Sequence, residues 1–371
     1  MSDTTVARAA PAANLLSLET PVPIVDLDRL ERNLQRMARY TAQHGLALRP
    51  HVKTHKTPWI AAQQVALGAV GLTCATPREA EEMSAVVGDI LVAYPPVGSG
   101  RLRRLMSLPA DLRLTVALDS AEALQGLAAA ARAAGRRVGV YVELDLGMRR
   151  VGVATVAEAI DLVRLTARDA ALEFRGVAFY PGHIRGGVDT QDEAIALLRA
   201  EVMAVRAAFD RAGIEVPVIS GGSTPTAWRA HETGATEVRP GTYVFNDRTT
   251  ALMGACAWDD CALTVLATVV STAVPGQAVI DAGSKALGRE PPRAEADGFG
   301  VLMAHPDVTV KAMSEEHGLL DLSRTDWRPG VGDVVRVVPN HVCIVVHLND
   351  RLVGVRGDMV EQEWDVAARG R

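Results

Sequence analysis

Short apolar runs alternate with longer helix-like stretches between residues 46 and 243. Regular alternation of this kind is typical of a parallel α/β fold. The helix-like stretches also begin with start signals, such as Thr76 followed by Pro77 and then by Glu79, where a capping box requires it. Eight strand–helix units can be counted, and they predict a (β/α)8 barrel. The expected strands are 46–53, 70–75, 89–94, 113–118, 137–144, 172–180, 216–220 and 235–239.

The pattern changes after residue 245. Turn signals such as Pro275-Gly276 separate short strand-like runs at 265–274, 278–280, 334–338, 343–347 and 352–355. The predicted fold class is therefore α/β, with a (β/α)8 barrel followed by a mainly β C-terminal domain. The expected division is a mobile leader over residues 1–20, a strand over 21–27 that joins the β domain, the barrel over 28–245, and the mainly β domain over 246–371.

Composition and charge exclude several classes of protein. The 371 residues are 48% hydrophobic, which is enough to bury the cores of two domains. The formal net charge is -5, and Lys and Arg are scattered among Asp and Glu, so nucleic acid is not an expected partner. No apolar run reaches the roughly 20 residues that a membrane helix needs, so no membrane partner is expected. The first 20 residues lack the pattern of a secretion signal, and the four cysteines form no regular framework. We therefore expect a cytoplasmic protein.

Polar residues follow the predicted strands, beginning with a lysine. Active sites of (β/α)8 barrels lie at the C-terminal ends of the strands, and a lysine there can form a Schiff base with an aldehyde cofactor. Lys53 occupies such a place in the segment from His51 to Lys56. Taken alone, this segment also fits a basic strand end that faces solvent. The other strand ends are followed by Asp145-Leu-Gly-Met-Arg-Arg150, Tyr180-Pro-Gly-His183, Ser220-Gly-Gly-Ser-Thr224 and Arg239-Pro-Gly-Thr-Tyr243.

The loops after the seventh and eighth strands are candidates for binding a phosphate group. Their glycines would let backbone N–H groups approach a phosphate, and their hydroxyl side chains could add donors. Phosphate sites recur in these two loops of such barrels, although a plain tight turn has a similar sequence. The candidate residues are Ser220, Gly221, Gly222, Ser223, Thr224, Gly241 and Thr242.

His341 and Cys343 are a candidate metal pair. They follow a predicted strand of the β domain at positions i and i+2, which lie on the same face of a strand. Both residue types bind transition metals. An isolated pair with this spacing is more often one buried histidine and one buried cysteine, so the spacing alone leaves both interpretations open.

Together these segments resemble the D-threonine aldolase and D-serine dehydratase family of enzymes, which use pyridoxal phosphate (PLP). The resemblance extends through nearly the whole chain, and its clearest parts are residues 47–56, 145–152, 239–241 and 340–356. It implies that Lys53, and not Lys56, forms the Schiff base. As in the wider alanine-racemase-type barrel, it implies Arg150 at the cofactor phenolate and Arg239 near the pyridine nitrogen. An arginine there would keep the ring neutral and weaken the cofactor as an electron sink.

The resemblance also bears on the metal and on the substrate contacts. In the dehydratase branch the matching histidine and cysteine bind zinc beside the cofactor, whereas the second ligand in the aldolase branch is usually Asp. Cys343 therefore favours the dehydratase branch, and a thiolate favours zinc over magnesium, with manganese or magnesium as alternatives. Tyr180 is expected to contact the cofactor, and His183 the substrate. The roles of His51, His55 and His317 stay open.

The expected function is that of a PLP- and metal-dependent lyase that acts on D-3-hydroxy amino acids such as D-serine, D-threonine or 3-hydroxyaspartate. A dehydratase would form a 2-oxo acid and ammonia, and this activity is favoured. An aldolase would form glycine and an aldehyde with the same cofactor and metal. A two-base racemase is disfavoured because no tyrosine follows Tyr243. A non-catalytic PLP-binding protein is the alternative from another class, and the family implies a homodimer.

Overall fold

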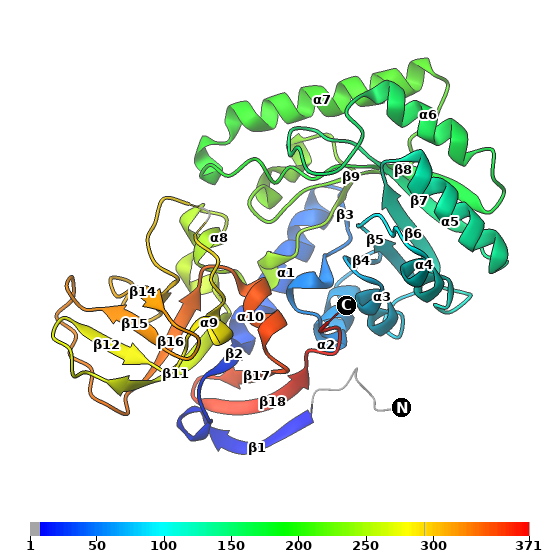
Figure 1. The fold of residues 1–371 in the computed structure, drawn as a ribbon. Coiled ribbons are helices and arrows are strands. Elements are labelled where there is room, and N and C mark those ends of the chain that lie inside the picture. Colours follow the sequence, from blue (N-terminus) through cyan, green and yellow to red (C-terminus); the bar gives the residue numbers. More distant parts are fainter. Residues whose placement is uncertain (1–7, 293, 371) are drawn as a thin grey trace. The chain divides into compact units, whose positions relative to one another are not determined.

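The computed structural model of the protein describes residues 8–370, apart from residue 293, and the chain divides into two compact units (Figure 1). The barrel unit contains residues 37–53, 60–241 and 370. The β unit contains residues 8–36, 54–59 and 242–369. Helix α1 (Leu27–Gln43) is shared by both units, with residues 27–36 in the β unit and residues 37–43 in the barrel unit. None of the helices in the described residues is long and apolar enough to cross a membrane.

The barrel unit contains eight parallel strands in the order β3-β10-β9-β8-β7-β6-β5-β4. Between β3 and β4, Val70 N donates to Leu48 O and Thr73 N donates to Pro50 O, each at 2.9 Å, and these bonds close the ring. The predicted (β/α)8 barrel is confirmed. Its strands are β3 (Ala47–Leu48), β4 (Leu72–Cys74), β5 (Asp89–Val92), β6 (Arg113–Leu118), β7 (Val138–Glu143), β8 (Leu172–Ala178), β9 (Ile219–Gly221) and β10 (Glu237–Val238).

Several helices of the barrel begin with a side-chain cap. Thr76 accepts a hydrogen bond from Glu79 N at 3.2 Å, and Pro77 occupies the first turn. Thr155 and Glu158 form a full capping box. These caps satisfy backbone N–H groups that have no partner inside a helix. The helices are α2 (Pro58–Ala66), α3 (Pro77–Met83), α4 (Ser99–Met106), α5 (Ala121–Ala133), α6 (Val156–Thr166) and α7 (Asp192–Arg211), with a 3-10 helix, η4 (Ala227–Glu232), after β9.

The first barrel strand is much shorter than expected. Its ladder ends at Leu48, and beyond it only His51 adds an isolated bridge, to Thr73. Pro50 interrupts the ladder because it has no N–H to donate. The chain then turns into a 3-10 helix, η2 (Val52–Thr54). Lys53 therefore lies on a helical turn after the strand and not at the strand's last residue.

The β unit is built on a ten-stranded sheet with the path β1-β18-β17-β2-β11-β12-β15-β14, and β16 pairs with both β11 and β13. Residues 1–7 of the predicted leader lie outside the described residues. The next residues of that leader form β1, which pairs antiparallel with β18. The strands are β1 (Arg8–Asn14), β2 (Val22–Asp26), β11 (Leu263–Ser271), β12 (Gln277–Ile280), β13 (Gly300–Leu302), β14 (Val310–Met313), β15 (Gly318–Asp321), β16 (Val334–Pro339), β17 (Arg351–Arg356) and β18 (Met359–Asp365).

The predicted strand over residues 343–347 is wrong, because this segment forms helix α10 (Val342–Leu348). Its buried residues are Val342, Val345 and Val346, which are spaced for one face of a helix. The β-branched residues had suggested a strand. Two further short helices, α8 (Arg248–Leu252) and α9 (Ser284–Leu287), belong to the same unit.

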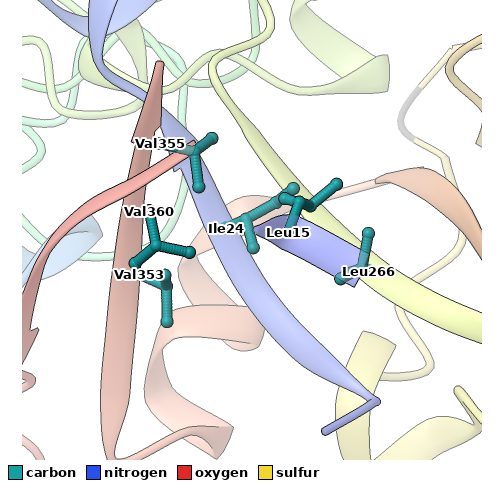
Figure 2. Close-up of a cluster of buried hydrophobic side chains, with 6 residues drawn as sticks. All are labelled: Leu15, Ile24, Leu266, Val353, Val355 and Val360. Carbon is teal, nitrogen blue, oxygen red and sulfur yellow. The ribbon is translucent and has the colours of Figure 1, made fainter. Parts of the chain in front are cut away.

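A compact apolar cluster holds the central strands of the β unit together (Figure 2). Ile24 of β2 is fully buried between side chains from β11, β17 and β18. β2 pairs with both β11 and β17, and β17 pairs with β18, so the cluster links four neighbouring strands. The cluster consists of Leu15, Ile24, Leu266, Val353, Val355 and Val360.

Replacing Ile24 by Ala should lower the free energy of unfolding of the β unit by about 2–5 kcal/mol, because the lost methyl groups leave a cavity. Urea denaturation followed by tryptophan fluorescence measures this change, since Trp59, Trp258, Trp327 and Trp364 all belong to the β unit. Leu16→Ala is the control, because the Leu16 side chain is 70% exposed. Equal effects of the two substitutions would show that the cluster does not stabilise the unit.

Candidate active site

Lys53 and Lys56 have different surroundings although they are close in the sequence. Lys53 is half-buried, and its backbone N–H donates to Nδ1 of His51 at 3.4 Å. Lys56 is buried, has a left-handed backbone with φ of 55°, and directs its Nζ to the carbonyl oxygen of Ala368 at 3.3 Å. The N–H of Ala368 donates back to the Lys56 carbonyl at 3.1 Å. Lys56 therefore anchors the C-terminal segment of the β unit.

The loop after β7 is shaped to present Arg150. Oδ1 of Asp145 accepts hydrogen bonds from the N–H groups of Gly147 at 3.0 Å and Arg149 at 2.9 Å. Gly147 and Arg149 have positive φ angles of 103° and 54°, so the chain folds tightly around the carboxylate. The Arg150 guanidinium then lies over the ring of Tyr180, with 4.7 Å between its Cζ and the ring centroid. This cation–π contact joins the loops after β7 and β8.

A second contact between these two loops depends on a glycine. A Cβ atom at Gly147 would lie 2.8 Å from Cε1 of His183, so any larger residue would push the imidazole away. His183 is otherwise exposed. The structure thus brings Arg150, Tyr180 and His183 to one place at the carboxyl ends of β7 and β8.

The loop after β9 is closely packed, and the hydroxyl groups of Ser220 and Ser223 are both engaged in hydrogen bonds. A Cβ at Gly221 would lie 2.1 Å from Cζ of Phe179, and Gly222 has φ of 92°. Ser223 and Thr226 share a hydrogen bond between their hydroxyl groups at 3.0 Å. The Ser220 hydroxyl is buried and donates to Glu237 Oε1 at 2.6 Å, so this side chain belongs to the barrel interior.

Two of the candidate residues follow β10 at the border of the two units. Gly241 is buried and is the last barrel-unit residue before the chain enters the β unit. Thr242 begins a 3-10 helix, η5 (Thr242–Val244), and belongs to the β unit. Thr224, like Ser223, is buried and lies before η4 in the barrel unit.

Arg239 lies inside the barrel. Its Nη1 donates to the Ser220 hydroxyl, and its Nη2 donates to the carbonyl oxygen of Phe179 at 2.9 Å. Burial lowers the pKa of Arg239, while the charges of Glu143 and Glu237 act in the opposite direction. Burial likewise raises the pKa of Glu143, and the positive charges of Arg239 and Arg150 oppose this rise. Glu143 therefore interacts with both arginines that were expected to meet the cofactor.

His341 and Cys343 meet at the beginning of α10. His341 is the N-cap residue, and Cys343 lies in the first turn. The expectation that they share one face of a strand is therefore wrong. Burial lowers the pKa of His341, but the Cys343 charge and the hydrogen bond with Asp247 outweigh it, so the net pKa shift is upward. In the β unit, Sγ of Cys343 also donates to Oγ1 of Thr54 at 3.4 Å, and Thr54 follows Lys53 in the chain.

Asp247 holds His341 and two helices at once. Its Oδ1 accepts from Thr250 N at 2.9 Å and so caps α8. Its Oδ2 lies 2.9 Å from Nδ1 of His341 and 3.3 Å from the N–H of Val342, the first residue of α10. A carboxylate on one ring nitrogen leaves the other, Nε2, to bind a metal. Asp247 is fully buried, so this orientation is well defined.

The donor set at α10 fits a transition metal with an incomplete protein shell. An imidazole nitrogen backed by a carboxylate and a neighbouring thiol suit zinc, and both donors come from one helix start. No group of three or more His, Cys, Asp or Glu side chains placed to hold a metal occurs in the part of the chain that the structure describes. A metal on this pair would thus keep positions for water or substrate.

Two parts of the chain match known protein families. Residues 25–249 match the family described as alanine racemase, N-terminal domain, and residues 262–355 match the putative serine dehydratase domain. The first match covers most of the barrel, and the second covers much of the β unit. The chain belongs to the PLP-dependent family that joins these two domains and includes D-threonine aldolase and D-serine dehydratase. It is a lyase of this family.

An aldolase and a dehydratase are among the relatives that match nearly the full chain. D-threonine aldolase of Arthrobacter sp. is 33% identical over 98% of this chain and 96% of its own length. D-threo-3-hydroxyaspartate dehydratase of Delftia sp. is 37% identical over 95% of this chain and 98% of its own length. The relatives therefore include both an aldolase and a dehydratase.

Solved structures agree with this placement. The D-threonine aldolase of Filomicrobium marinum has a TM-score of 0.88 at 33% identity, over 98% of this chain and 99% of that chain. A D-threo-3-hydroxyaspartate dehydratase with one cysteine changed to alanine, in the metal-free form, has a TM-score of 0.87 at 32% identity, over 97% of this chain and 100% of that chain. Another variant of this dehydratase has alanine in place of a histidine two positions earlier.

Sequence reasoning missed three buried acidic residues that interact with candidate residues inside their own units. Asp247 had a local signal, because Asp247 and Thr250 have the spacing of an N-cap. Glu143 and Glu237 are acidic residues at the ends of otherwise apolar strands. Strand alternation places such residues toward the barrel interior, where a charge needs a partner. A charged residue at the end of an apolar strand was therefore the sequence signal that could have identified Glu143 and Glu237.

If His341 and Cys343 bind zinc, replacing Asp247 by Asn should weaken that binding roughly 10–100-fold, the usual effect of losing a carboxylate behind a ligating histidine. Asn can still cap α8, so the helix start should survive. Competition with a chromogenic zinc chelator measures the affinity. Asp259→Asn is the control, because Asp259 belongs to the same unit and its side chain is 87% exposed. Unchanged zinc affinity in the Asp247 variant would contradict this role.

Proposed function

We propose that this protein is a PLP- and metal-dependent dehydratase that converts a D-3-hydroxy amino acid to a 2-oxo acid and ammonia. Among such substrates we favour D-threo-3-hydroxyaspartate. The observation that carries the proposal is the His341–Cys343 pair at the start of α10, with Asp247 behind the histidine. The family supplies the PLP dependence, and the pair supplies the donors for a metal.

Lys53 is the proposed point of covalent attachment of the cofactor. It is half-buried on the turn after β3, whereas the amine of the competing Lys56 is directed to the Ala368 carbonyl. When bound, PLP withdraws electrons from the substrate α-carbon and so makes its proton acidic. Once the substrate amine has replaced it, Nζ of Lys53 is the proposed base that takes this α-proton.

The other barrel residues are proposed to hold the cofactor in place. Arg150 would meet the phenolate, with Tyr180 beneath its guanidinium. Arg239 would approach the pyridine nitrogen, and a guanidinium there keeps that nitrogen unprotonated. The phosphate would be bound by the loops after β9 and β10, through the backbone of Gly221 and Gly222 and residues Ser223, Thr224, Gly241 and Thr242. His183, at the edge of this group, would contact the substrate.

His341 and Cys343 are proposed to bind zinc. A bound metal would act as a Lewis acid on the substrate hydroxyl, which is a poor leaving group near neutral pH. Support comes from the dehydratase relatives, in which alanine variants of a histidine and of a cysteine two positions later have been solved, the cysteine variant in a metal-free form. His341 and Cys343 have the same spacing. The homodimer stays a prediction of the family resemblance.

The aldolase is the second candidate, and specific relatives favour it. A 3-hydroxy-D-aspartate aldolase of Paracoccus denitrificans is 32% identical over 98% of this chain, close to the value for the Arthrobacter aldolase. Cys343 is the residue that favours elimination over cleavage here, because the aldolase branch usually has Asp at this place.

Incubation of the zinc-loaded holoenzyme with D-threo-3-hydroxyaspartate should give oxaloacetate and ammonia. The same substrate would give glycine and glyoxylate by cleavage of the Cα–Cβ bond, so the products separate the two activities. Chromatography with an enzymatic ammonia assay measures them. The L-enantiomer is the control, and chelation should remove turnover until zinc is restored. Glycine as the main product would replace the dehydratase proposal by the aldolase, and full turnover after chelation would refute the metal's role.

A matched pair of substitutions tests the lysine assignment. Lys53→Met should abolish covalent attachment of PLP, because it removes the amine and keeps most of the side-chain volume. Lys56→Met should retain attachment and lower stability, since it removes the hydrogen bond to Ala368. Borohydride reduction followed by mass spectrometry shows whether the cofactor stays on the chain. Attachment to the Lys53 variant and not to the Lys56 variant would reverse the assignment.

A further inference from the structure

Arg239 is a buried cation whose hydrogen bonds go to uncharged atoms. They run to the Ser220 hydroxyl and the Phe179 carbonyl, and the residue is only 8% exposed. A buried guanidinium needs negative charge nearby, because its burial without compensation is strongly unfavourable. The compensating carboxylates must therefore lie beyond these first contacts.

Glu237 lies directly behind Ser220. It precedes Arg239 by two residues, a spacing that points both side chains to the same side of an extended chain. Its Oε1 accepts from the Ser220 hydroxyl at 2.6 Å and from the Tyr141 hydroxyl at 3.5 Å. Its Oε2 accepts from Nε of Arg49 at 2.7 Å. Both oxygens of this fully enclosed carboxylate are thus occupied.

The Ser220 hydroxyl connects the two charged groups. A serine hydroxyl has one proton to donate, and an ionised carboxylate can only accept. The proton of Ser220 therefore points to Glu237, and the oxygen lone pairs face Nη1 of Arg239. Because Glu237 takes the Ser220 proton, Ser220 acts only as an acceptor toward Arg239 and holds the guanidinium through Nη1.

We propose that Glu237 is a positioning residue for Arg239. Glu237 acts through Ser220 and fixes the direction in which the Arg239 guanidinium presents its other N–H groups to the cofactor. The inference rests on the proposed function, in which Arg239 approaches the pyridine nitrogen. Because the guanidinium is a planar fork, a small rotation about its bonds redirects every N–H group. The negative charge of Glu237 also compensates the buried cation.

The same carboxylate contributes to the barrel core, and this offers a matched control. Arg49 bonds Glu237 through Nε and Asp89 through Nη1, each at 2.7 Å. Within the described residues, Asp89 makes no hydrogen bond or ion pair with Ser220 or Arg239. Asp89→Asn therefore weakens the shared core network without touching the Ser220 contact.

The test titrates the purified apoprotein with PLP in wild type, Glu237→Gln, Ser220→Ala and Asp89→Asn. The dissociation constant and the absorption maximum of the bound cofactor are measured beside the melting temperature. Glu237→Gln and Ser220→Ala should each raise the dissociation constant roughly 10–100-fold, the range for losing a hydrogen bond to a charged group. Each should also shift the absorption maximum, and the double variant should add little to the larger single effect. Asp89→Asn should change only the melting temperature.

Two outcomes would overturn the inference, and they differ in what else they affect. If wild type binds PLP and Glu237→Gln matches Asp89→Asn in dissociation constant and absorption maximum, Glu237 serves the fold alone. If wild type does not bind PLP, the proposed function fails and this inference fails with it. Should Glu237→Gln not fold, Ser220→Ala decides the matter, because it removes one hydroxyl and leaves the Arg49–Glu237 pair in place.

Discussion

The barrel unit depends on the pairing of charges in an interior that excludes water. Arg49 bridges Asp89 and Glu237, and Glu237 reaches Arg239 through Ser220. Each isolated charge would be costly there, whereas alternating signs with filled hydrogen bonds make the burial tolerable. The side chains come from β5, β9, β10 and the segments next to β3 and β10, so the network also specifies how these strands are arranged. Arg239, which is proposed to approach the cofactor, is thereby built into the core.

The β unit uses a buried carboxylate in another way. Asp247 caps α8, bonds the first N–H of α10 and orients the His341 ring. Helix N-termini carry unsatisfied N–H groups and a partial positive charge, so one carboxylate can satisfy two of them. The consequence for function is that the histidine is oriented by the same contact that starts the helix. A histidine held in this way would lose little freedom on binding a metal.

Much of the barrel could be predicted because its signals are local and repeated. Apolar runs marked all eight strands, and the residues after them, such as Arg150 and Tyr180, meet in the structure. Other parts depend on tertiary contacts. The run after His341 has β-branched residues but forms α10, because burial at helical spacing and the contact with Asp247 decide its conformation. Strands such as β14 and β18 carry charged residues, and their pairing depends on distant neighbours.

The two lyase activities need different chemical groups at the substrate hydroxyl. The residues around His341 and Cys343, the proposed metal pair, bear on which group is present. Cleavage to glycine requires a base that removes the hydroxyl proton, whereas elimination requires an electron acceptor on the oxygen. The carboxylate beside His341 is already engaged, because both oxygens of Asp247 accept hydrogen bonds from helix N–H groups or the imidazole. Its oxygens are thereby committed to orienting His341 and to capping two helices. If His341 and Cys343 bind a metal as proposed, that metal would be the Lewis acid that draws the oxygen away from Cβ, while Asp247 keeps the histidine in place.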